Sequence, residues 1–275
     1  MVRSGGEISD EGGDQRGVAG DASGWTRPMA GAAMSRCTPP ALGGAEGTPN
    51  LSDGCLDNPV WHALDGPHGP FAQRRALAAR YRAAVAPFGA LKSGAGVDGW
   101  QDASTLDRSG LTVFVAPPSA PPDTWQVVRV IPGIQMVQVD VDACPDARAV
   151  ELSRADVAEM MDLVVTARPG PFRARAVDLG HYLGFRREGR LVAMAGERMR
   201  CPGWTEISAV CTHPSARGEG LATRLVRAMV AHVNGRGDRA FLHVSSGNQD
   251  AVALYRRLGF AERAEIRFMF ASPPD

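Results

Sequence analysis

The sequence lacks the features that mark membrane, metal-binding or nucleic-acid-binding proteins. No run of about 18 apolar residues occurs, and the opening MVRSGGEISDEGGDQRG has acids and glycines where an export signal needs an apolar run. The five cysteines form neither a CxxC pair nor a Cys/His cluster at metal-ligand spacing. Thirty basic and thirty acidic residues give a formal net charge of +0, so no overall field attracts nucleic acid or an anionic membrane. We therefore expect a cytoplasmic protein with reduced cysteines, no metal, and no nucleic-acid or membrane partner.

The first part of the chain also lacks the apolar periodicity of a folded unit. Residues 1–55 are mainly Gly, Ser, Ala, Pro and charged residues, which cannot bury enough apolar surface to offset the entropy of ordering. We expect a disordered tail over residues 1–55. The native start is left open between Met1, Met29 and Met34.

Residues 56–146 have the pattern of a small mixed α/β unit. Leu77, Tyr81 and Val85 recur at helical spacing and predict a helix. Three β-rich runs follow, and a proline-rich loop separates the first from the second: LTVFV, WQVVRVI and IQMVQVDV. No chemical motif lies in this unit. Its role stays open, and it can be read as a degenerate half of the domain that follows or as an interaction unit.

Residues 147–275 alternate between strand and helix patterns. Ser153 and Asp156 have the spacing of a capping box, which predicts a helix through Val165. The other expected helices lie around Ala174 to Leu183, from Gly218 to Val233 with an apolar residue at every fourth position, and from Ala251 to Leu258. The expected strands are AVELS, RLVAMAGERM, WTEISAVCTHP, AFLHVSS and AEIRFMF. This order indicates the α/β (α+β) class.

The strongest chemical signal is a glycine-rich turn before a helix. The segment Arg217-Gly218-Glu219-Gly220-Leu221-Ala222 joins the strand WTEISAVCTHP to that helix. Two glycines let the backbone approach a ligand closely, and the N–H groups of a first helical turn have no intrahelical partners. The helix dipole and Arg217 favour an anion, and pyrophosphate fits this place. Taken alone the turn is weak evidence, because a glycine-rich helix start often holds no ligand.

Two motifs together resemble the GNAT superfamily of N-acyltransferases. The pyrophosphate loop of that family follows Q/R-x-x-G-x-G/A, which Arg217, Gly220 and Ala222 satisfy. A second family signature stands here as Asn248, Ala251, Leu254-Tyr255 and Leu258-Gly259-Phe260. The resemblance covers about residues 147–270, and within the superfamily it is strongest to the glycine-acyltransferase-like subgroup.

The resemblance implies a GNAT-type mixed, mostly antiparallel sheet with a splayed central strand pair and flanking helices, preceded by the smaller α/β unit. It also implies acetyl-CoA as the acyl donor, with its pantetheine arm against backbone groups at a β-bulge. The residues implied to hold it are Val210, Cys211, Thr212, Arg217, Gly218, Glu219, Gly220, Leu221, Ala222 and Asn248. Asn248 has the alternative role of capping its helix.

Two residues are implied to handle protons. Glu206 matches the position of a family carboxylate that acts as general base, and its alternative is a solvated strand residue. Tyr255 matches the family tyrosine that protonates the leaving thiolate, although its spacing also fits a core stripe. Cys211 has no identifiable histidine partner, so a cysteine nucleophile is disfavoured. His243 lies in apolar surroundings and is expected to satisfy core hydrogen bonds.

The resemblance thus predicts an N-acetyltransferase that moves an acetyl group from acetyl-CoA to a primary amine by direct attack in a ternary complex. The alternative is a non-catalytic acyl-CoA sensor. The acceptor is not identified, since Arg168, Arg173 and Arg175 can hold an acidic acceptor or form a solvated surface. A homodimer is left open.

Overall fold

The computed structural model describes residues 53–106 and 110–274. The expected tail, 1–55, lies outside these residues except for its last positions, which belong to the 3-10 helix η2 (Asp53–Asp57). Cys55 in this helix is buried, so the packed part begins slightly before the expected boundary.

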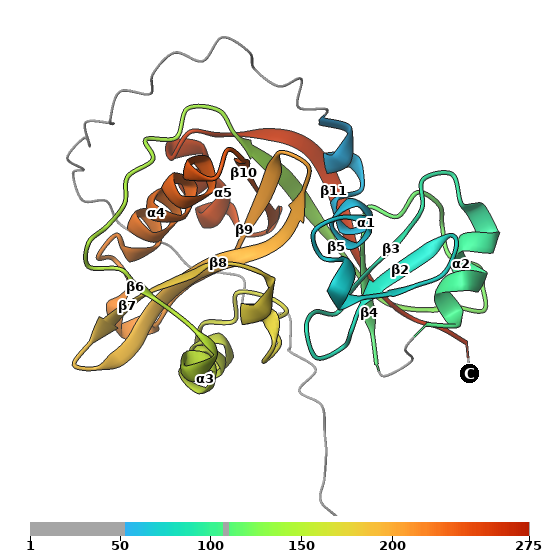
Figure 1. Ribbon diagram of the computed structural model, residues 1–275, viewed down its shortest axis with the longest axis horizontal. Helices are drawn as coiled ribbons and strands as arrows, with labels where there is room; N and C mark the ends of the chain where they lie inside the picture. Colours follow the sequence, from blue (N-terminus) through green and yellow to red (C-terminus); the bar gives the residue numbers. More distant parts are fainter. Residues whose placement is uncertain (1–52, 107–109, 275) are drawn as a thin grey trace, which may run out of the picture.

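The further elements are α1 (Pro59–Asp65), η3 (Gly69–Phe71), β1 (Ala72–Arg74), β2 (Ala78–Tyr81), β3 (Phe88–Leu91), α2 (Gly96–Ser104), β4 (Thr112–Val115), β5 (Gln126–Gln138), β6 (Val150–Glu151), η4 (Arg154–Asp156), α3 (Val157–Ala167), η5 (Ala176–Leu179), β7 (Tyr182–Arg187), β8 (Arg190–Cys201), β9 (Trp204–Thr212), η6 (Pro214–Ala216), α4 (Leu221–Gly235), β10 (Arg239–Ser245), α5 (Gln249–Arg257) and β11 (Phe260–Ser272) (Figure 1).

One curled sheet runs through the whole described chain. Its 11 strands follow the order β1-β2-β3-β4-β11-β5-β10-β9-β8-β7-β6. Only the neighbours β3/β4 and β9/β10 pair in parallel, and the other pairs are antiparallel. The expected mixed, mostly antiparallel sheet with flanking helices is therefore confirmed.

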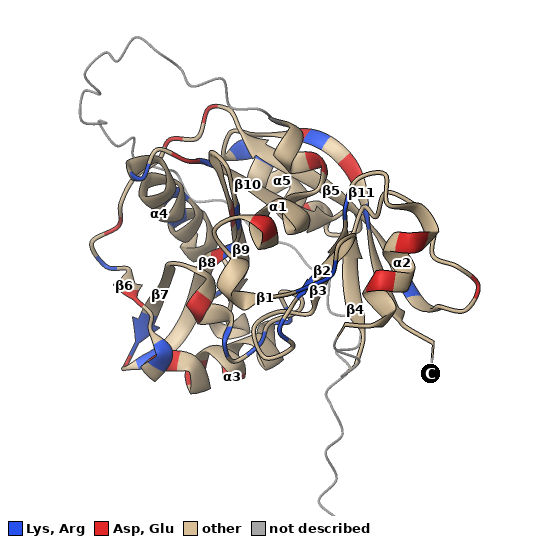
Figure 2. Cartoon of the chain, turned by 45° about the vertical axis from the view of Figure 1, so that its right-hand side comes forward, with Lys and Arg blue, Asp and Glu red and all other residues tan. Residues whose placement is uncertain are grey.

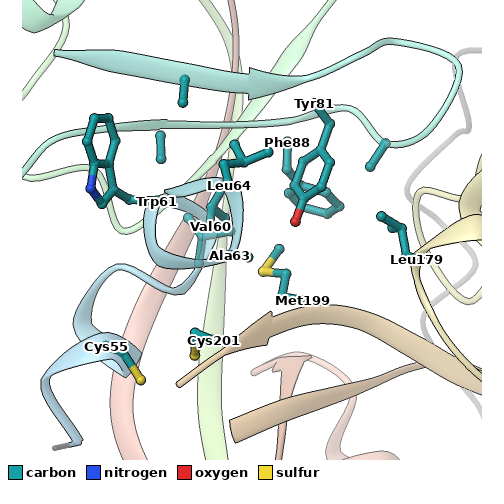
Figure 3. Packing of buried hydrophobic residues seen from close by; sticks show 14 of the residues in the cluster. Cys55, Val60, Trp61, Ala63, Leu64, Tyr81, Phe88, Leu179, Met199 and Cys201 are labelled. Carbon is teal, nitrogen blue, oxygen red and sulfur yellow. The ribbon is translucent and has the colours of Figure 1, made fainter. Parts of the chain in front are cut away.

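The sheet crosses the expected boundary between residues 146 and 147. Strand β5 lies between β11 and β10, and Gly133–Val137 pair with β10 while the opposite edge pairs with β11 along its length. A shared core accompanies this pairing: Val60 and Leu64 of α1 lie with Tyr81 and Phe88 over Met199 of β8 (Figure 3). The division into units at 56–146 and 147–275 stays a prediction, and the two portions share both sheet and core.

Three elements differ from the sequence expectations. The helix predicted at Leu77, Tyr81 and Val85 is wrong, because Ala78–Tyr81 form the fully buried strand β2. The helix expected around Ala174 to Leu183 is reduced to η5, since the apolar residues from Tyr182 onward pair with β8 instead. WQVVRVI and IQMVQVDV form one strand, β5. Its Pro132 lies just before the first residue that pairs with β10, so the missing N–H removes no bond to that strand.

The other helices follow their sequence signals. The Ser153/Asp156 capping box is present, and α3 follows it. On α4 the predicted stripe is fully buried at Leu225, Met229 and Val233. Basic and acidic positions occur in all parts of the molecule (Figure 2). Among the described residues, no helix has the length and apolar character needed to cross a membrane.

Candidate functional site

The two central parallel strands separate beside a bulge. Strands β9 and β10 pair only from Trp204↔Arg239 to Glu206↔Phe241, and beyond Glu206 they have no paired residues. Further along β9, Ala209 has a positive φ of 53°. The register against β8 shifts there, because Ser208 faces Gly196 and Cys211 faces Met194. The expected splayed pair and β-bulge are thus present.

A groove of about 1230 Å³ opens where the strands separate. Strand β9 lines it from Ile207 to Thr212, and the N-terminal turn of α4 and one face of α5 line it as well. Of the residues predicted to hold the cofactor, eight line this groove: Val210, Cys211, Thr212, Arg217, Glu219, Gly220, Ala222 and Asn248. Gly218 and Leu221 do not line it, and Leu221 packs into the core beneath α4.

The N-terminus of α4 has the backbone geometry of an anion site. Gly218 and Gly220 have φ values of 85° and 72°, the left-handed conformation that glycine adopts without strain. Gly220 is the N-cap of α4 and makes no side-chain cap, so the first-turn N–H groups are left for a ligand. Apart from the neighbouring residues and the backbone of the helix itself, no atom of the described residues lies within 4 Å of a Cβ built on Gly220, so the space above it is open. Glu219 forms an ion pair with Arg187.

Two buried polar atoms of the groove have no hydrogen-bond partner within the described part of the chain. They are Thr212 Oγ1, just after the bulge, and Arg224 Nη2, in the first turns of α4. The Arg224 Nε atom donates to Asp146 Oδ2 at 2.5 Å, which holds the guanidinium in place. Buried polar groups are rarely left unpaired, so both atoms are suited to a polar ligand in the groove.

The environment of Cys211, which lines the groove, does not favour a nucleophilic thiolate. Burial raises the pKa of the Cys211 thiol to about 12, so the thiolate is scarce at neutral pH. This agrees with the expectation that no cysteine nucleophile operates. Cys144 is disulfide-bonded, so the expectation that all cysteines are reduced is wrong at this residue.

Tyr255 and Asn248 lie on α5, beside the groove. Burial raises the pKa of Tyr255 above its ordinary value of 10, so its hydroxyl stays protonated at neutral pH. That hydroxyl has no hydrogen-bond partner among residues 53–106 and 110–274, nor is it one of the fully enclosed polar atoms, so it is open to the groove. The Asn248 side chain accepts from Ala251 N at 3.2 Å, so its capping role is present.

Glu206 lies behind the groove rather than in its wall. Its side chain is fully buried, and Arg198 binds both of its oxygens, through Nε at 2.7 Å and through Nη2. Burial alone would raise the pKa of this carboxyl, but the charge of Arg198 and the hydrogen bonds from Arg198 and His243 outweigh it and lower the pKa to about 2. A carboxylate with this pKa and no contact with the groove is a poor proton acceptor. The base role predicted for Glu206 stays untested, and this environment does not favour it.

His243 completes the network around Glu206. Gln135 Nε2 also donates to Leu56 O, so its orientation is fixed and it donates to His243 Nε2 at 3.1 Å. His243 therefore carries its hydrogen on Nδ1, which lies 2.7 Å from Glu206 Oε1. Both ring nitrogens are engaged, which agrees with the expected core role of His243. Sequence reasoning missed Arg198, although Arg198 and Glu206 flank a Pro-Gly hairpin turn and this signal was available.

Comparison with known proteins agrees with this geometry. A family model described as FR47-like protein matches residues 182–269. A solved GNAT-family structure from Novosphingobium aromaticivorans is 37% identical, with a TM-score of 0.74, and the match covers 80% of this chain and 99% of that one. A GCN5-related N-acetyltransferase from Kribbella flavida, at 16% identity and a TM-score of 0.52, shares the fold. The splayed strands, the bulge and the glycine-rich helix start define a GNAT fold, and the chain belongs to the GNAT family.

Curated relatives match over shorter stretches. N-alpha-acetyltransferase RimI of Mycobacterium tuberculosis is 37% identical over 90 residues, which are 32% of this chain and 55% of that protein. Mycothiol acetyltransferase of Thermomonospora curvata is 35% identical over 89 residues, 32% of this chain and 30% of that protein. This chain therefore matches about half or less of the length of these relatives.

Proposed function

We propose that this protein transfers an acetyl group from acetyl-CoA to a primary amine by direct attack in a ternary complex. The observation that carries the proposal is the open N-terminus of α4 at one end of a groove that starts between splayed strands. The family membership supports it, and the relatives above are named acetyltransferases. The acceptor of RimI or of the mycothiol enzymes is not carried over to this chain.

In this proposal the cofactor lies along the residues that line the groove. The pyrophosphate sits at the first turn of α4, where free N–H groups, the helix dipole and Arg217 favour an anion. The pantetheine arm follows Val210 to Thr212, whose backbone is released from pairing with β10. Arg224 Nη2 gains a partner when the anionic groups are bound. These contacts position the thioester carbonyl beside the acceptor amine.

Tyr255 is the proposed general acid. Attack of the neutral amine nitrogen on the thioester carbon forms a tetrahedral intermediate, and its collapse breaks the carbon–sulfur bond. The attacking nitrogen, which is an ammonium in the intermediate, releases one proton to solvent water, and the departing thiolate takes one from Tyr255, which regains a proton from solvent. A tyrosine kept protonated by burial and open to the groove can supply the proton to sulfur.

Glu206 is proposed as a positioning residue. It fixes Arg198 and His243 and does not touch the reacting amine. Alkylammonium groups have pKa values of roughly 10, so a carboxylate with a pKa of about 2 cannot hold their proton effectively. The acceptor is therefore proposed to enter as the neutral amine, and the rate should rise with pH as that form becomes more abundant.

Replacing Glu206 with Gln separates positioning from base catalysis. We expect kcat/KM to fall by a similar factor at every pH between 6 and 9, because a positioning role does not depend on proton transfer. A pH–rate profile measures this, with Glu262→Gln as control, since Glu262 pairs with Arg256 on an exposed face. Partial recovery of Glu206→Gln as the pH rises would instead restore Glu206 as the general base.

We also expect Glu206→Gln to be less stable than wild type, by an amount that depends on pH. Because the pKa of Glu206 is lowered from 4.5 to about 2, its ion pair stabilises the folded state above about pH 4.5, and this is lost as the pH falls toward 2. Glu206→Gln should lower the free energy of unfolding by about 3 kcal/mol at pH 7, since Arg198 is left unpaired. Denaturant titrations at pH 7, 5 and 3 should show the difference from wild type shrinking with acidity.

A screen of primary amines with acetyl-CoA, with free thiol as the readout, tests the proposed function. Thiol release that depends on both the amine and the protein is the expected result. Binding of acetyl-CoA without turnover of any amine would favour the alternative, a non-catalytic acyl-CoA sensor.

A further inference from the structure

The groove is lined by β9, α4 and α5 and also by strands that lie beyond β10 in the sheet order, and we call the part at these strands its second end. This end is walled by apolar side chains from strands on both sides of residue 146: Phe88 of β3, Val113 of β4, Ile131 of β5, and Phe268 and Phe270 of β11. Phe88 and Val113 are buried, whereas Ile131, Phe268 and Phe270 are half-buried and border the open space. None of these side chains belongs to the expected cofactor set.

One charged side chain lies among these apolar walls. The Arg198 guanidinium stacks on Phe88 with its central carbon 4.6 Å from the ring centroid, and only 13% of the side chain is exposed. Its Nε and Nη2 atoms are both used by Glu206. Nη1 has no hydrogen-bond partner in the described ranges, yet it is not one of the fully enclosed polar atoms, so its donors are open to the groove.

The charge balance defines what this end of the groove can bind. Glu206 neutralises Arg198, so the pair presents N–H donors without a strong net charge. An apolar body fits the phenylalanine walls, and a hydrogen-bond-accepting oxygen fits Nη1. A strongly cationic acceptor such as a polyamine finds no free carboxylate here, because both oxygens of Glu206 are occupied.

We propose that this end is the acceptor pocket and that it takes a small primary amine with an apolar body and a carbonyl or carboxylate oxygen that binds Arg198 Nη1. The inference rests on the proposed function. Glu206 lies three residues before the bulge residue Ala209 on β9, which is roughly 10 Å along an extended strand. Arg198 is held beside Glu206 by their ion pair. A ligand anchored at Arg198 thus extends its amine toward the cofactor end.

The test uses three matched amines: phenylalaninamide, 2-phenylethylamine, which lacks the carbonyl, and glycinamide, which lacks the apolar body. Calorimetry measures their binding to the protein–CoA complex, and thiol release from acetyl-CoA measures turnover. We expect phenylalaninamide to bind best, with spermidine weaker than all three. Binding and turnover are separate readouts, so failure of the chemistry and failure of the pocket are distinguishable.

Two variants assign the contacts. Arg198→Lys keeps a cation beside Glu206 but loses the Nη1 donors, so the preference for phenylalaninamide over 2-phenylethylamine should shrink roughly 5- to 10-fold, the effect of about one hydrogen bond. The preference is compared between wild type and Arg198→Lys, so the different basicities of the two amines affect both proteins equally and cancel. Phe268→Ala should weaken both aromatic amines roughly 10-fold and leave glycinamide unchanged. Phe71→Ala is the control, because this half-buried phenylalanine lies outside the groove.

The possible results distinguish failure of the acceptor pocket from failure of the transfer reaction. The expected binding order without thiol release would leave the pocket in place and overturn the proposed transfer reaction. Turnover of glycinamide or spermidine as good as that of phenylalaninamide would overturn the pocket and leave the transfer reaction. An unchanged preference in a folded Arg198→Lys protein, together with unaltered binding in Phe268→Ala, would also overturn the pocket.

Discussion

The Gly220→Asp protein should bind CoA roughly 100-fold more weakly than wild type, or worse, while remaining folded. The substitution places a carboxylate above the first turn of α4, where the pyrophosphate is proposed to lie. Two negative charges in contact repel each other strongly. The site has room for the side chain, because in the described part of the chain only the adjacent residues and the helix's own backbone come near a Cβ built on Gly220. Calorimetric titration with CoA measures the effect.

Gly237→Asp is the matched control for backbone strain. Gly237 has a φ of 85° and open space around its Cβ direction, as Gly220 does, but it follows the C-terminal end of α4 and does not line the groove. Both variants should lose a similar amount of thermal stability, and only Gly220→Asp should lose CoA binding. Equal affinities in the two proteins would remove the pyrophosphate assignment.

Tyr255→Phe should lower kcat by about 10- to 10⁴-fold, the range of a lost general acid, with little change in acetyl-CoA affinity. The substitution keeps the ring that packs edge-on against Phe260 and removes only the hydroxyl that opens to the groove. Single-turnover kinetics with acetyl-CoA and an active amine would isolate the chemical step.

Tyr182→Phe controls for the loss of a buried tyrosine hydroxyl in itself. Tyr182 is 2% exposed, belongs to the cluster between α3 and β8, and does not line the groove. It should keep a near-normal kcat. A Tyr255→Phe enzyme as active as Tyr182→Phe would show that Tyr255 is a core residue only.

The sequence predicted most of the groove residues around α4 and α5, which are proposed to hold the cofactor, because their signals are local. The glycines before α4 and the cap of α5 act within a few residues, so Gly220 and Asn248 are recognisable from their neighbours alone. The bulge at Ala209 was reached through the family resemblance. Tyr255, the proposed general acid, was also selected from its motif, although its periodicity by itself indicated only packing.

The second end of the groove was not predictable in the same way. Phe88, Ile131 and Phe268 come from three distant segments, and they meet at one wall only because β3 pairs with β4, β4 with β11, and β11 with β5. Glu206 was predicted to be a base from the family resemblance, and the sequence does not show that Arg198 occupies its oxygens. The wrong helix at Leu77 to Val85 has a related cause, since β2 is buried on all sides and loses the alternation that marks a strand.

The position of β5 between β10 and β11 has a consequence for the order in which the protein assembles. During synthesis β5 emerges about 100 residues before β10 and more than 100 residues before β11. Until then both edges of β5 lack their pairing strands. Pairings over such separations form slowly, and the exposed strand is open to wrong partners in the meantime. The groove is complete only after the final strand has been added. A nascent chain that stops before Phe260 lacks β11, one of the two partners of β5, together with the wall residues Phe268 and Phe270, and we expect chaperones to hold it.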